Sequence, residues 1–295
     1  MARSAPVIQQ RRLRAELKRL REKAGLTQKQ VADAVGWSPS KVLRIEGGGG
    51  SASTSDVMAL LHYFGVSGDK ADELIEITRE LPTAWWDEYK SFYPPHFINF
   101  LGYEDAATRI RQFMGHTVPG LLQTERYILA LFAGYMVGGE ERIKRGVKVR
   151  LKRQELLTRE GGPETTFIID EAVLHRWVGG PDVVVEQLEQ LKVHAAKPRV
   201  SLRIIPFSAG IHPRMLATFT IFEFPGDPED YAVIEEDANT EQIIRDNPEI
   251  SAKYLTTFSE LEASASSEEE SIEIIDSIIK TMQLKAGNEP RPRKR

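Results

Sequence analysis

The sequence contains no cysteine, so it excludes disulfide bonds and metal sites built from thiolates. No apolar run approaches the roughly 20 residues that a membrane-spanning helix needs, and the N-terminal residues lack the apolar centre of a secretion signal. The six histidines show none of the short spacings that are typical of metal sites. We therefore expect a soluble, cytoplasmic protein that holds no metal and no other cofactor.

Recognisable catalytic motifs are also missing, since the sequence has no G-x-S-x-G elbow and no G-x-x-x-x-G-K-[ST] phosphate loop. Glu171 and His175 lie four residues apart on an expected helix, where a local pair is the simpler interpretation. His212 and Arg214 lie in a loop after a strand, where binding sites often form, although a lone histidine is more often structural. The sequence therefore predicts no enzyme, and it leaves His212 and Arg214 as candidates for contact with a ligand or partner.

The charge is unevenly distributed along a chain whose formal net charge is −4. Residues 1–50 contain eleven Lys and Arg against four Asp and Glu, a net of +7. Residues 227–276 contain sixteen acidic residues against two basic ones, a net of −14. The basic N-terminal part indicates a polyanionic partner, whereas the acidic part is most simply a solvated surface.

The stretch from Leu26 to Gly48 predicts two short helices joined by a tight turn. Thr27 suits the N-cap of the first helix, and Gly36 accepts a left-handed backbone where the chain reverses. Pro39 suits the first position of the second helix. The residues expected to face inward are Val31, Ala32, Val35, Val42 and Ile45. The outer face of the second helix then carries Ser38, Ser40, Lys41 and Arg44.

This stretch resembles the helix-turn-helix of the Cro and lambda-repressor type, the XRE family, in the pattern TQxxVAxxVGxSxSxVxRIExG. The resemblance implies a sequence-specific transcription regulator that binds double-stranded DNA as a homodimer and is associated with the nucleoid. We expect Arg44 and Lys41 to be the main base readers, beside Ser38 and Ser40. Gln28 and Lys29 are expected to hold phosphates. The run Gly47–Gly50 departs from the family pattern and predicts a flexible exit.

Two domains are expected from the length of 295 residues. Residues 1–81 predict an all-α, five-helix repressor-type domain, and residues 82–284 a larger α+β domain with a small, mostly antiparallel sheet. The expected strands are 165–170, 199–207, 216–224 and 231–236. The expected helices of this part include 104–115, 140–160, 183–196, 247–265 and 268–284. Residues 285–295 predict a disordered, charged tail.

Two features of the second part have open interpretations. The basic helix at 142–153 is a second DNA contact, a docking face for an acidic partner, or a solvated surface. Trp85 and Trp86 begin an aromatic stretch that is typical of a packed core or interface, and the alternative is a cage for an aromatic ligand.

Further landmarks run in order from Trp85 to Met282: WW, VPGLLQT-x-x-Y, R-x-x-RQ-x-LL, EAVLHRWVGGP with QL-x-x-L, and RIIPF-x-x-GIHP. They resemble the domain of unknown function that follows a repressor-type helix-turn-helix in many actinobacterial regulators, including the WhiJ-like regulators. The resemblance implies a transcription regulator whose C-terminal domain binds a partner protein or a signal. Two alternatives remain: an antitoxin-like partner of a small protein encoded by a neighbouring gene, with autoregulatory DNA binding, and a regulator that senses a small ligand.

Overall fold

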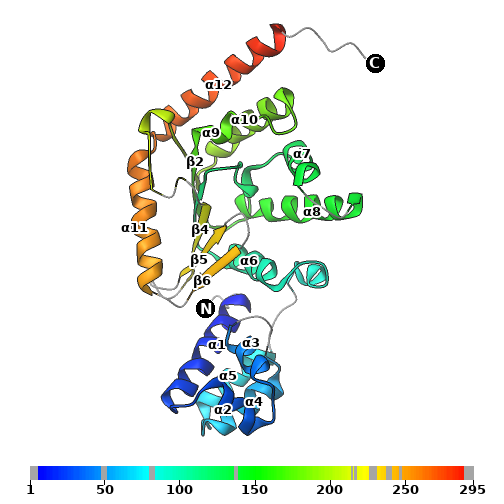
Figure 1. The fold of residues 1–295 in the computed structure, drawn as a ribbon, viewed down its shortest axis with the longest axis vertical. Coiled ribbons are helices and arrows are strands. Elements are labelled where there is room, and N and C mark those ends of the chain that lie inside the picture. Colours follow the sequence, from blue (N-terminus) through cyan, green and yellow to red (C-terminus); the bar gives the residue numbers. More distant parts are fainter. Residues whose placement is uncertain are drawn as a thin grey trace. The chain divides into compact units, whose positions relative to one another are not determined.

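The computed structural model describes residues 6–47, 52–79, 84–135, 139–213, 215, 218–225, 231–236, 241–245 and 248–288. The chain divides into two compact units, Met1–Ala106 and Ala107–Arg295. Figure 1 shows that the first unit is helical and that the second is built around a sheet. Within the described ranges, no helix is long and apolar enough to cross a membrane.

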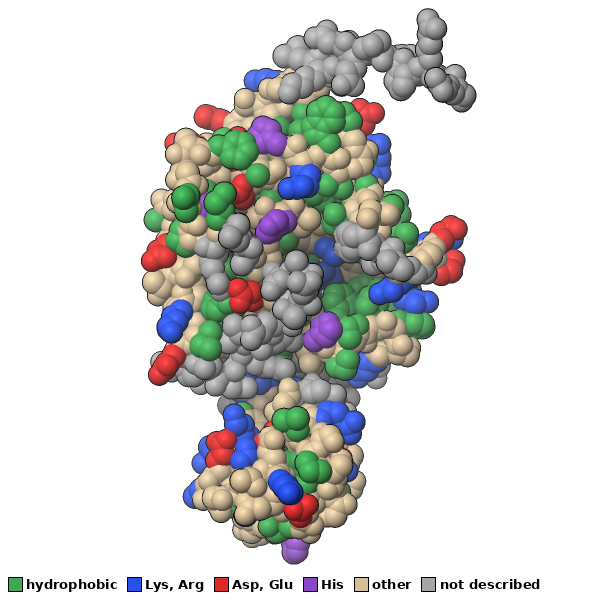
Figure 2. Space-filling model, in the orientation of Figure 1, with side chains coloured by type: hydrophobic (Ala, Val, Ile, Leu, Met, Phe, Trp, Pro, Cys, Tyr) green, Lys and Arg blue, Asp and Glu red, His purple; other side chains and the backbone are tan. Residues whose placement is uncertain are grey.

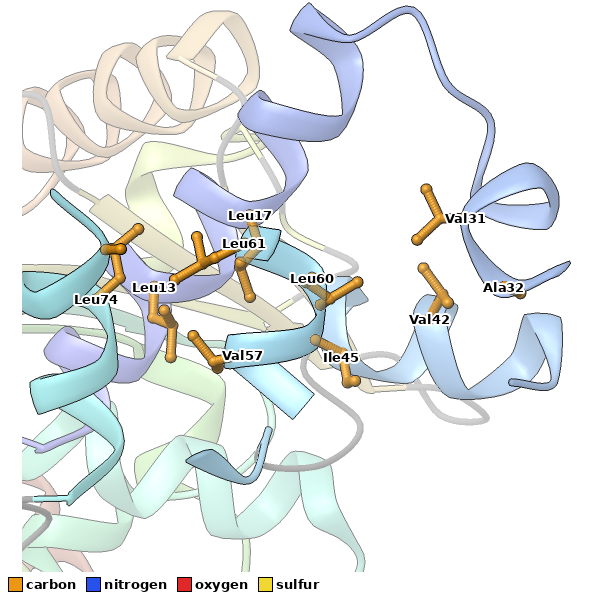
Figure 3. Close-up of a cluster of buried hydrophobic side chains, with 11 residues drawn as sticks. Leu13, Leu17, Val31, Ala32, Val42, Ile45, Val57, Leu60, Leu61 and Leu74 are labelled. Atoms are coloured by element: carbon orange, nitrogen blue, oxygen red, sulfur yellow. The ribbon is translucent and has the colours of Figure 1, made fainter. Parts of the chain in front are cut away.

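The helices at the start of the first unit enclose one apolar core (Figure 3). They are α1 (Pro6–Lys23), α2 (Gln28–Val35), α3 (Pro39–Gly47), α4 (Thr54–Tyr63) and α5 (Asp69–Arg79). Leu13 and Leu17 recur at helical spacing on α1 and are at most 4% exposed. Every helix contributes to the core, and burying each Leu or Val side chain stabilises the fold by about 1.5–3 kcal/mol.

The aromatic stretch completes the first unit with a 3-10 turn, η1 (Asp87–Tyr89), and with α6 (Pro95–Ala106), which contacts α1. Its rings pack in series: Trp85 lies 5.5 Å from Trp86 and 6.2 Å from Tyr89 between ring centroids. Trp86 and Tyr89 are buried. The aromatic rings therefore pack against one another, and a ligand role for Trp85 and Trp86 stays a prediction. The first unit ends at Ala106 and so includes α6. The predicted domain boundary between residues 81 and 82 lies outside the described residues.

The second unit contains a six-stranded mixed sheet in the order β3-β2-β1-β4-β5-β6. The parallel strands are β1 (Arg109–Met114), β2 (Glu164–Asp170) and β3 (Val200–Ile205). The antiparallel additions beside β1 are β4 (Thr218–Glu223), β5 (Tyr231–Glu236) and β6 (Glu241–Arg245). β1 therefore joins the parallel half of the sheet to the antiparallel half.

The predicted mostly antiparallel sheet is wrong, because the pairs β1–β2 and β2–β3 are parallel. The error begins at residues 104–115, which the sequence analysis assigns to a helix and which contain β1. Ile110 and Phe113 of this strand are at most 1% exposed between β2 and β4. A central strand is specified by the strands that flank it more than by its own residue pattern. β6 is a further strand that the sequence analysis does not include.

Helices cover both sides of the sheet (Figure 1). α11 (Pro248–Ser264) contacts β3, β5 and β6 and buries Phe258 and Leu261 in a core that includes Phe113. α7 (Glu125–Tyr135) and α8 (Gly139–Gln154) lie on the other side. α10 (Pro181–Ala195) and α12 (Glu268–Asn288) pack against each other and β3. The shorter turns are η2 (Gly120–Leu122), η3 (Glu155–Leu157), α9 (Glu171–Leu174) and η4 (Phe207–Ala209).

α12 begins with a capping box between Ser267 and Glu270. The Ser267 N–H donates to Glu270 Oε2 at 2.8 Å, and the Glu270 N–H donates to Ser267 Oγ at 3.1 Å. The helix continues to Asn288, so the predicted disordered tail begins inside α12. Residues 289–295 of that tail lie outside the described residues.

A network of glutamine side chains joins the buried segment Val118–Thr124 to α8 and α10. Gln123 donates to the Val118 carbonyl at 2.7 Å, and Gln154 of α8 donates to two carbonyls of the segment at 3.0 and 2.8 Å. Gln187 of α10 donates to a fourth carbonyl, that of Leu122, at 2.8 Å and accepts the Thr124 N–H at 2.7 Å. These amides provide hydrogen-bond partners that a buried loop needs. The landmarks VPGLLQT, RQ-x-LL and QL-x-x-L therefore meet at one joint, here called the glutamine joint.

Candidate nucleic-acid interface

The turn between α2 and α3 follows from residues close together in the sequence. Thr27 caps α2, since its hydroxyl accepts the Gln30 N–H at 3.2 Å and its own N–H donates to Gln30 Oε1 at 2.8 Å. Gly36 ends the helix with φ 71° and donates its N–H to the Ala32 carbonyl. The predicted cap and the predicted left-handed glycine are both confirmed.

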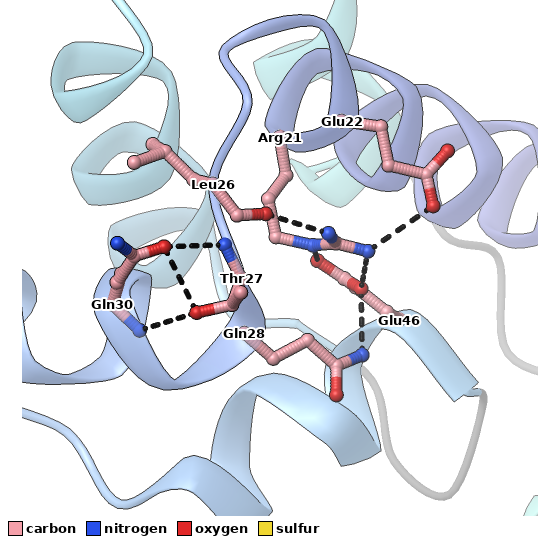
Figure 4. A network of polar contacts seen from close by, with 7 residues as sticks. All are labelled: Arg21, Glu22, Leu26, Thr27, Gln28, Gln30 and Glu46. Atoms are coloured by element: carbon pink, nitrogen blue, oxygen red, sulfur yellow. Dashed lines mark hydrogen bonds and ion pairs between the residues drawn. The ribbon is translucent and has the colours of Figure 1, made fainter.

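A buried ion pair connects α1 to the end of α3 (Figure 4). Arg21 donates from Nε and Nη2 to the two carboxylate oxygens of Glu46 at 2.8 and 3.0 Å, and from Nη1 to the Leu26 carbonyl at 2.8 Å. The side chains of Arg21 and Glu46 are only 10% and 5% exposed. Their hydrogen bonds raise the pKa of the Arg21 guanidinium above its ordinary value. One carboxylate thus sets the position of α3 on the first helix.

Gln28 is part of the same network. Its Nε2 donates to Glu46 Oε2 at 2.8 Å, which ties the start of α2 to the end of α3. Gln28 is predicted as a phosphate contact, and that role stays a prediction. The contact that the structure shows is the one with Glu46. Glu46 is not among the predicted site residues. The sequence does contain a signal for this ion pair, since the RIExG pattern places a carboxylate after a helix that is rich in arginine.

The outer face of α3 is open to solvent. Ser38, Ser40 and Arg44 are exposed, and Leu43 between them is 57% exposed. Lys29, near the start of α2, is exposed as well. Within residues 6–47 and 52–79, no hydrogen bond or ion pair engages the side chain of Arg44 or Lys29. These cations are therefore available to an external anion.

Lys41 lies on α3 but is engaged by the protein. Its Nζ is 2.5 Å from Asp56 Oδ1 and 3.9 Å from the centroid of the Trp37 ring. Burial raises the pKa of the Asp56 carboxyl, but hydrogen bonds from Lys41 and Ser53 outweigh it and leave that pKa below its ordinary value. Lys41 and Arg44 are both predicted as main base readers, whereas Asp56 is not among the predicted site residues. The structure distinguishes the two cations by their partners.

Charges of both signs are interspersed on the face of the helical unit that Figure 2 draws. The exit from α3 through Gly48–Gly50 lies outside the described residues, so the predicted flexible loop stays a prediction.

The basic helix α8 places part of its charge inside the second unit. Val147 packs against Ile128 and Phe132 of α7. Arg153 is buried, and Arg150 lies 5.5 Å from the centroid of the Phe132 ring. The lysines of this helix at 144 and 152 pair with neighbouring glutamates. A DNA contact through residues 142–153 remains a hypothesis.

His212 is buried, with a side chain that is 1% exposed. Its Nε2 lies 2.9 Å from Asp170 Oδ2, and its Nδ1 lies 3.0 Å from the Pro213 carbonyl oxygen. Asp170 also caps α9 by accepting the Ala172 N–H at 2.8 Å. Both ring nitrogens are thus engaged, and the pair ties the loop after β3 to the end of β2. Arg214, the other candidate in this loop, lies outside the described residues.

Glu171 and His175 form the local pair predicted from their spacing, with Oε1 and Nε2 3.2 Å apart. Glu171 Oε2 also accepts the Phe207 N–H at 2.7 Å, and the His175 ring stacks on the Phe207 ring. Among the residues that the structure describes, no group of three or more histidines and acids could hold a metal ion.

Large apolar side chains are exposed in the segments that follow the parallel strands β2 and β3. Ile211 is 93% exposed and Phe207 is 60% exposed, beside the partly exposed Trp177 and Met215. The carboxyl ends of parallel strands are where open sheets of this kind most often bind ligands.

Comparison with known families supports both units. A family model described as a domain of unknown function (DUF5753) matches residues 97–277. A second model, described as a helix-turn-helix domain, matches residues 12–74 and so includes α2 and α3. No curated protein and no solved structure gives a significant match. The N-terminal match supports a DNA-binding regulator.

Proposed function

Because the chain belongs to the DUF5753 family and carries a helix-turn-helix domain, we propose that it is a sequence-specific transcription regulator that binds double-stranded DNA as a homodimer. The observation that carries this proposal is the outer face of α3, where Arg44 is exposed and engaged by no described residue. A helix of this kind enters the major groove. An arginine there reads guanine through two parallel hydrogen bonds to O6 and N7.

The neighbouring residues have supporting roles in this proposal. Ser40 adds a hydrogen bond to a base edge or a phosphate. Lys29, at the start of α2, binds a phosphate of the DNA backbone and so sets the register of the protein on the duplex. The ion pair between Arg21 and Glu46 keeps α3 at a fixed angle to α1, so that Arg44 reaches the same base each time. One such domain buries little DNA surface, which favours two copies on half-sites about one helical turn apart.

The experiment begins with selection of the preferred duplex from a random pool, followed by titration of the protein at several salt concentrations. Arg44→Ala is expected to weaken the selected site by about 1–3 kcal/mol and to relax preference at one base pair. Lys29→Ala should weaken all duplexes alike and reduce the slope of log K against log salt by about 0.9. The matched control is Arg79→Ala on α5, whose side chain is 58% exposed and pairs with Glu76. If Arg44→Ala and Arg79→Ala bind the selected site equally well, the assignment of α3 is wrong.

The homodimer is proposed to form through the second unit. Support comes from the exposed apolar side chains of Ile211 and Phe207, which are 93% and 60% exposed. Exposing such side chains to water is unfavourable, and association of two copies would bury them. Ile211→Asp should convert a dimer to a monomer in light scattering and weaken binding to a two-half-site duplex. A dimer that survives this change would leave the exposed segment to the partner protein or signal that the C-terminal domain is proposed to bind.

A further inference from the structure

α3 carries two cations, and the structure gives them different surroundings. Arg44 is exposed and engaged by no described residue, whereas Lys41 lies between the Asp56 carboxylate and the Trp37 ring. We infer that Asp56 determines which cation of α3 reaches DNA: it retains Lys41 on the protein surface and leaves Arg44 as the reading side chain. This inference rests on the proposed function and adds to it a residue that positions one of the two cations of α3.

Asp56 cannot follow Lys41 towards DNA, because it is part of the cap of α4. Its Oδ2 accepts the Ser53 N–H at 3.2 Å, and its own N–H donates to Ser53 Oγ at 3.1 Å. A carboxylate in the first turn is also favoured by the helix dipole. The Asp56 side chain is only 16% exposed. Lys41 must therefore leave a fixed partner whenever it contacts a phosphate or a base.

Two different contacts retain Lys41. The ion pair with Asp56 has a short N···O separation of 2.5 Å, and the ammonium also lies 3.9 Å from the centroid of the Trp37 ring. Both partners are close in sequence to α3, one before it and one at the start of α4. The cation is thus neutralised where it stands and adds no net charge to the surface that meets DNA.

The consequence for recognition follows from the chemistry of the two side chains. A lysine ammonium is a flexible point charge that binds any phosphate, whereas the planar guanidinium of arginine matches the acceptor pair of guanine. Retaining Lys41 lowers attraction to DNA of every sequence and leaves the reading by Arg44 unchanged. Asp56 therefore reduces the sequence-independent part of the affinity and leaves recognition of the base to Arg44.

The test compares the salt dependence of binding for four proteins: wild type, Asp56→Asn, Lys41→Met and the double variant. Asp56→Asn should release Lys41 to a phosphate and steepen the slope of log K against log salt by about 0.9. Its affinity should rise by a similar factor for a random-sequence duplex and for the selected site, because the added contact is to phosphate. Lys41→Met alone should leave the slope unchanged, and the double variant should return to the wild-type slope.

Two controls separate this effect from a damaged cap and from a general change of charge. Ser53→Ala removes the capping hydroxyl but retains the pair between Asp56 and Lys41, so its slope should match wild type. Glu73→Gln removes one negative charge and the 3.0 Å partner of Lys70 on α5, while Lys70 keeps Glu16 at 3.8 Å. It should steepen the slope by much less than Asp56→Asn does.

The inference is overturned if Asp56→Asn keeps the wild-type slope, if the double variant keeps the slope of Asp56→Asn, or if Lys41→Met alone flattens the slope by about 0.9. Because every slope is also measured on a random-sequence duplex, the result does not depend on a selected site. A protein that prefers no sequence would refute the proposed regulator while still testing the hold of Asp56 on Lys41.

Discussion

Removal of the Glu46 carboxylate should loosen the helix-turn-helix more than any exposed charge change in the same unit. In Glu46→Ala, the Arg21 guanidinium loses two hydrogen bonds and its buried counter-charge while its side chain remains only 10% exposed, and it keeps only the exposed carboxylate of Glu22. Gln28 loses its acceptor as well. Breaking one partner of a buried pair typically costs about 3–5 kcal/mol. That is a large fraction of the roughly 5–15 kcal/mol that stabilises a domain.

The measurement must be local, because a chain with two units need not unfold in one step. Hydrogen exchange of peptides that cover residues 26–47 reports the opening of α2 and α3 directly. A loss of this size should raise their exchange rates by roughly 10²–10⁴, since each 1.4 kcal/mol is a factor of ten. Peptides from the second unit should keep their rates.

Glu22→Ala is the matched control, because Glu22 also lies near Arg21, at 3.3 Å, but is 55% exposed. Such a surface pair contributes about 0–1 kcal/mol, so exchange in residues 26–47 should rise by less than tenfold. Equal exchange rates in Glu46→Ala and Glu22→Ala would refute the reasoning from burial. In Arg21→Met with Glu46→Ala, part of the lost protection should return, since no unpaired charge remains buried.

Other predictions concern the second unit. Gly134→Ala should raise the melting temperature and stabilise α7 by about 0.5–1 kcal/mol, since an added Cβ meets nothing within 4 Å. Gly179→Ala should lower the melting temperature and destabilise the fold by about 1–3 kcal/mol, because φ is +74° and the added Cβ would lie 2.7 Å from the Cβ of Ala130. Equal melting temperatures for Gly134→Ala and Gly179→Ala would contradict both predictions. Burial lowers the pKa of His194 from 6.5 to about 4, so its folded form binds fewer protons than the unfolded form. The neutral His194 therefore makes its full contribution to the free energy of unfolding above pH 6.5, and this contribution falls by about 3 kcal/mol as the pH drops towards 4. Hydrogen exchange of α10 peptides should show this pH dependence in the wild type and lose it in His194→Gln.

The features that the sequence predicts correctly depend on residues close together in the chain. The predicted cap at Thr27 depends on Gln30, which is only three residues away. Gly36 needs only its own lack of a side chain to adopt φ 71°. Such signals are readable because few alternatives compete over so short a distance.

The features that the sequence analysis misses depend on partners far along the chain. β1 pairs through Arg109 with Glu164 on one side and with Glu223 on the other, and neither neighbour is evident from the residues of β1 itself. The same holds for Arg21 with Glu46, since a chain with 39 basic and 43 acidic residues offers each charge many partners. The residue types of the interface are therefore predictable, whereas the internal engagement of Gln28 and Lys41 requires coordinates.

The glutamine joint differs from the proposed DNA-binding surface of α3 in its expected response to ionic strength. Phosphate contacts weaken steeply as salt rises, because bound counterions must be displaced. Amide hydrogen bonds from Gln123, Gln154 and Gln187 carry no net charge to be screened, and amides do not titrate over the physiological pH range. The joint is therefore expected to stay intact over salt concentrations at which phosphate contacts weaken by orders of magnitude, so a rise in ionic strength would act on the chain at its proposed DNA contacts first.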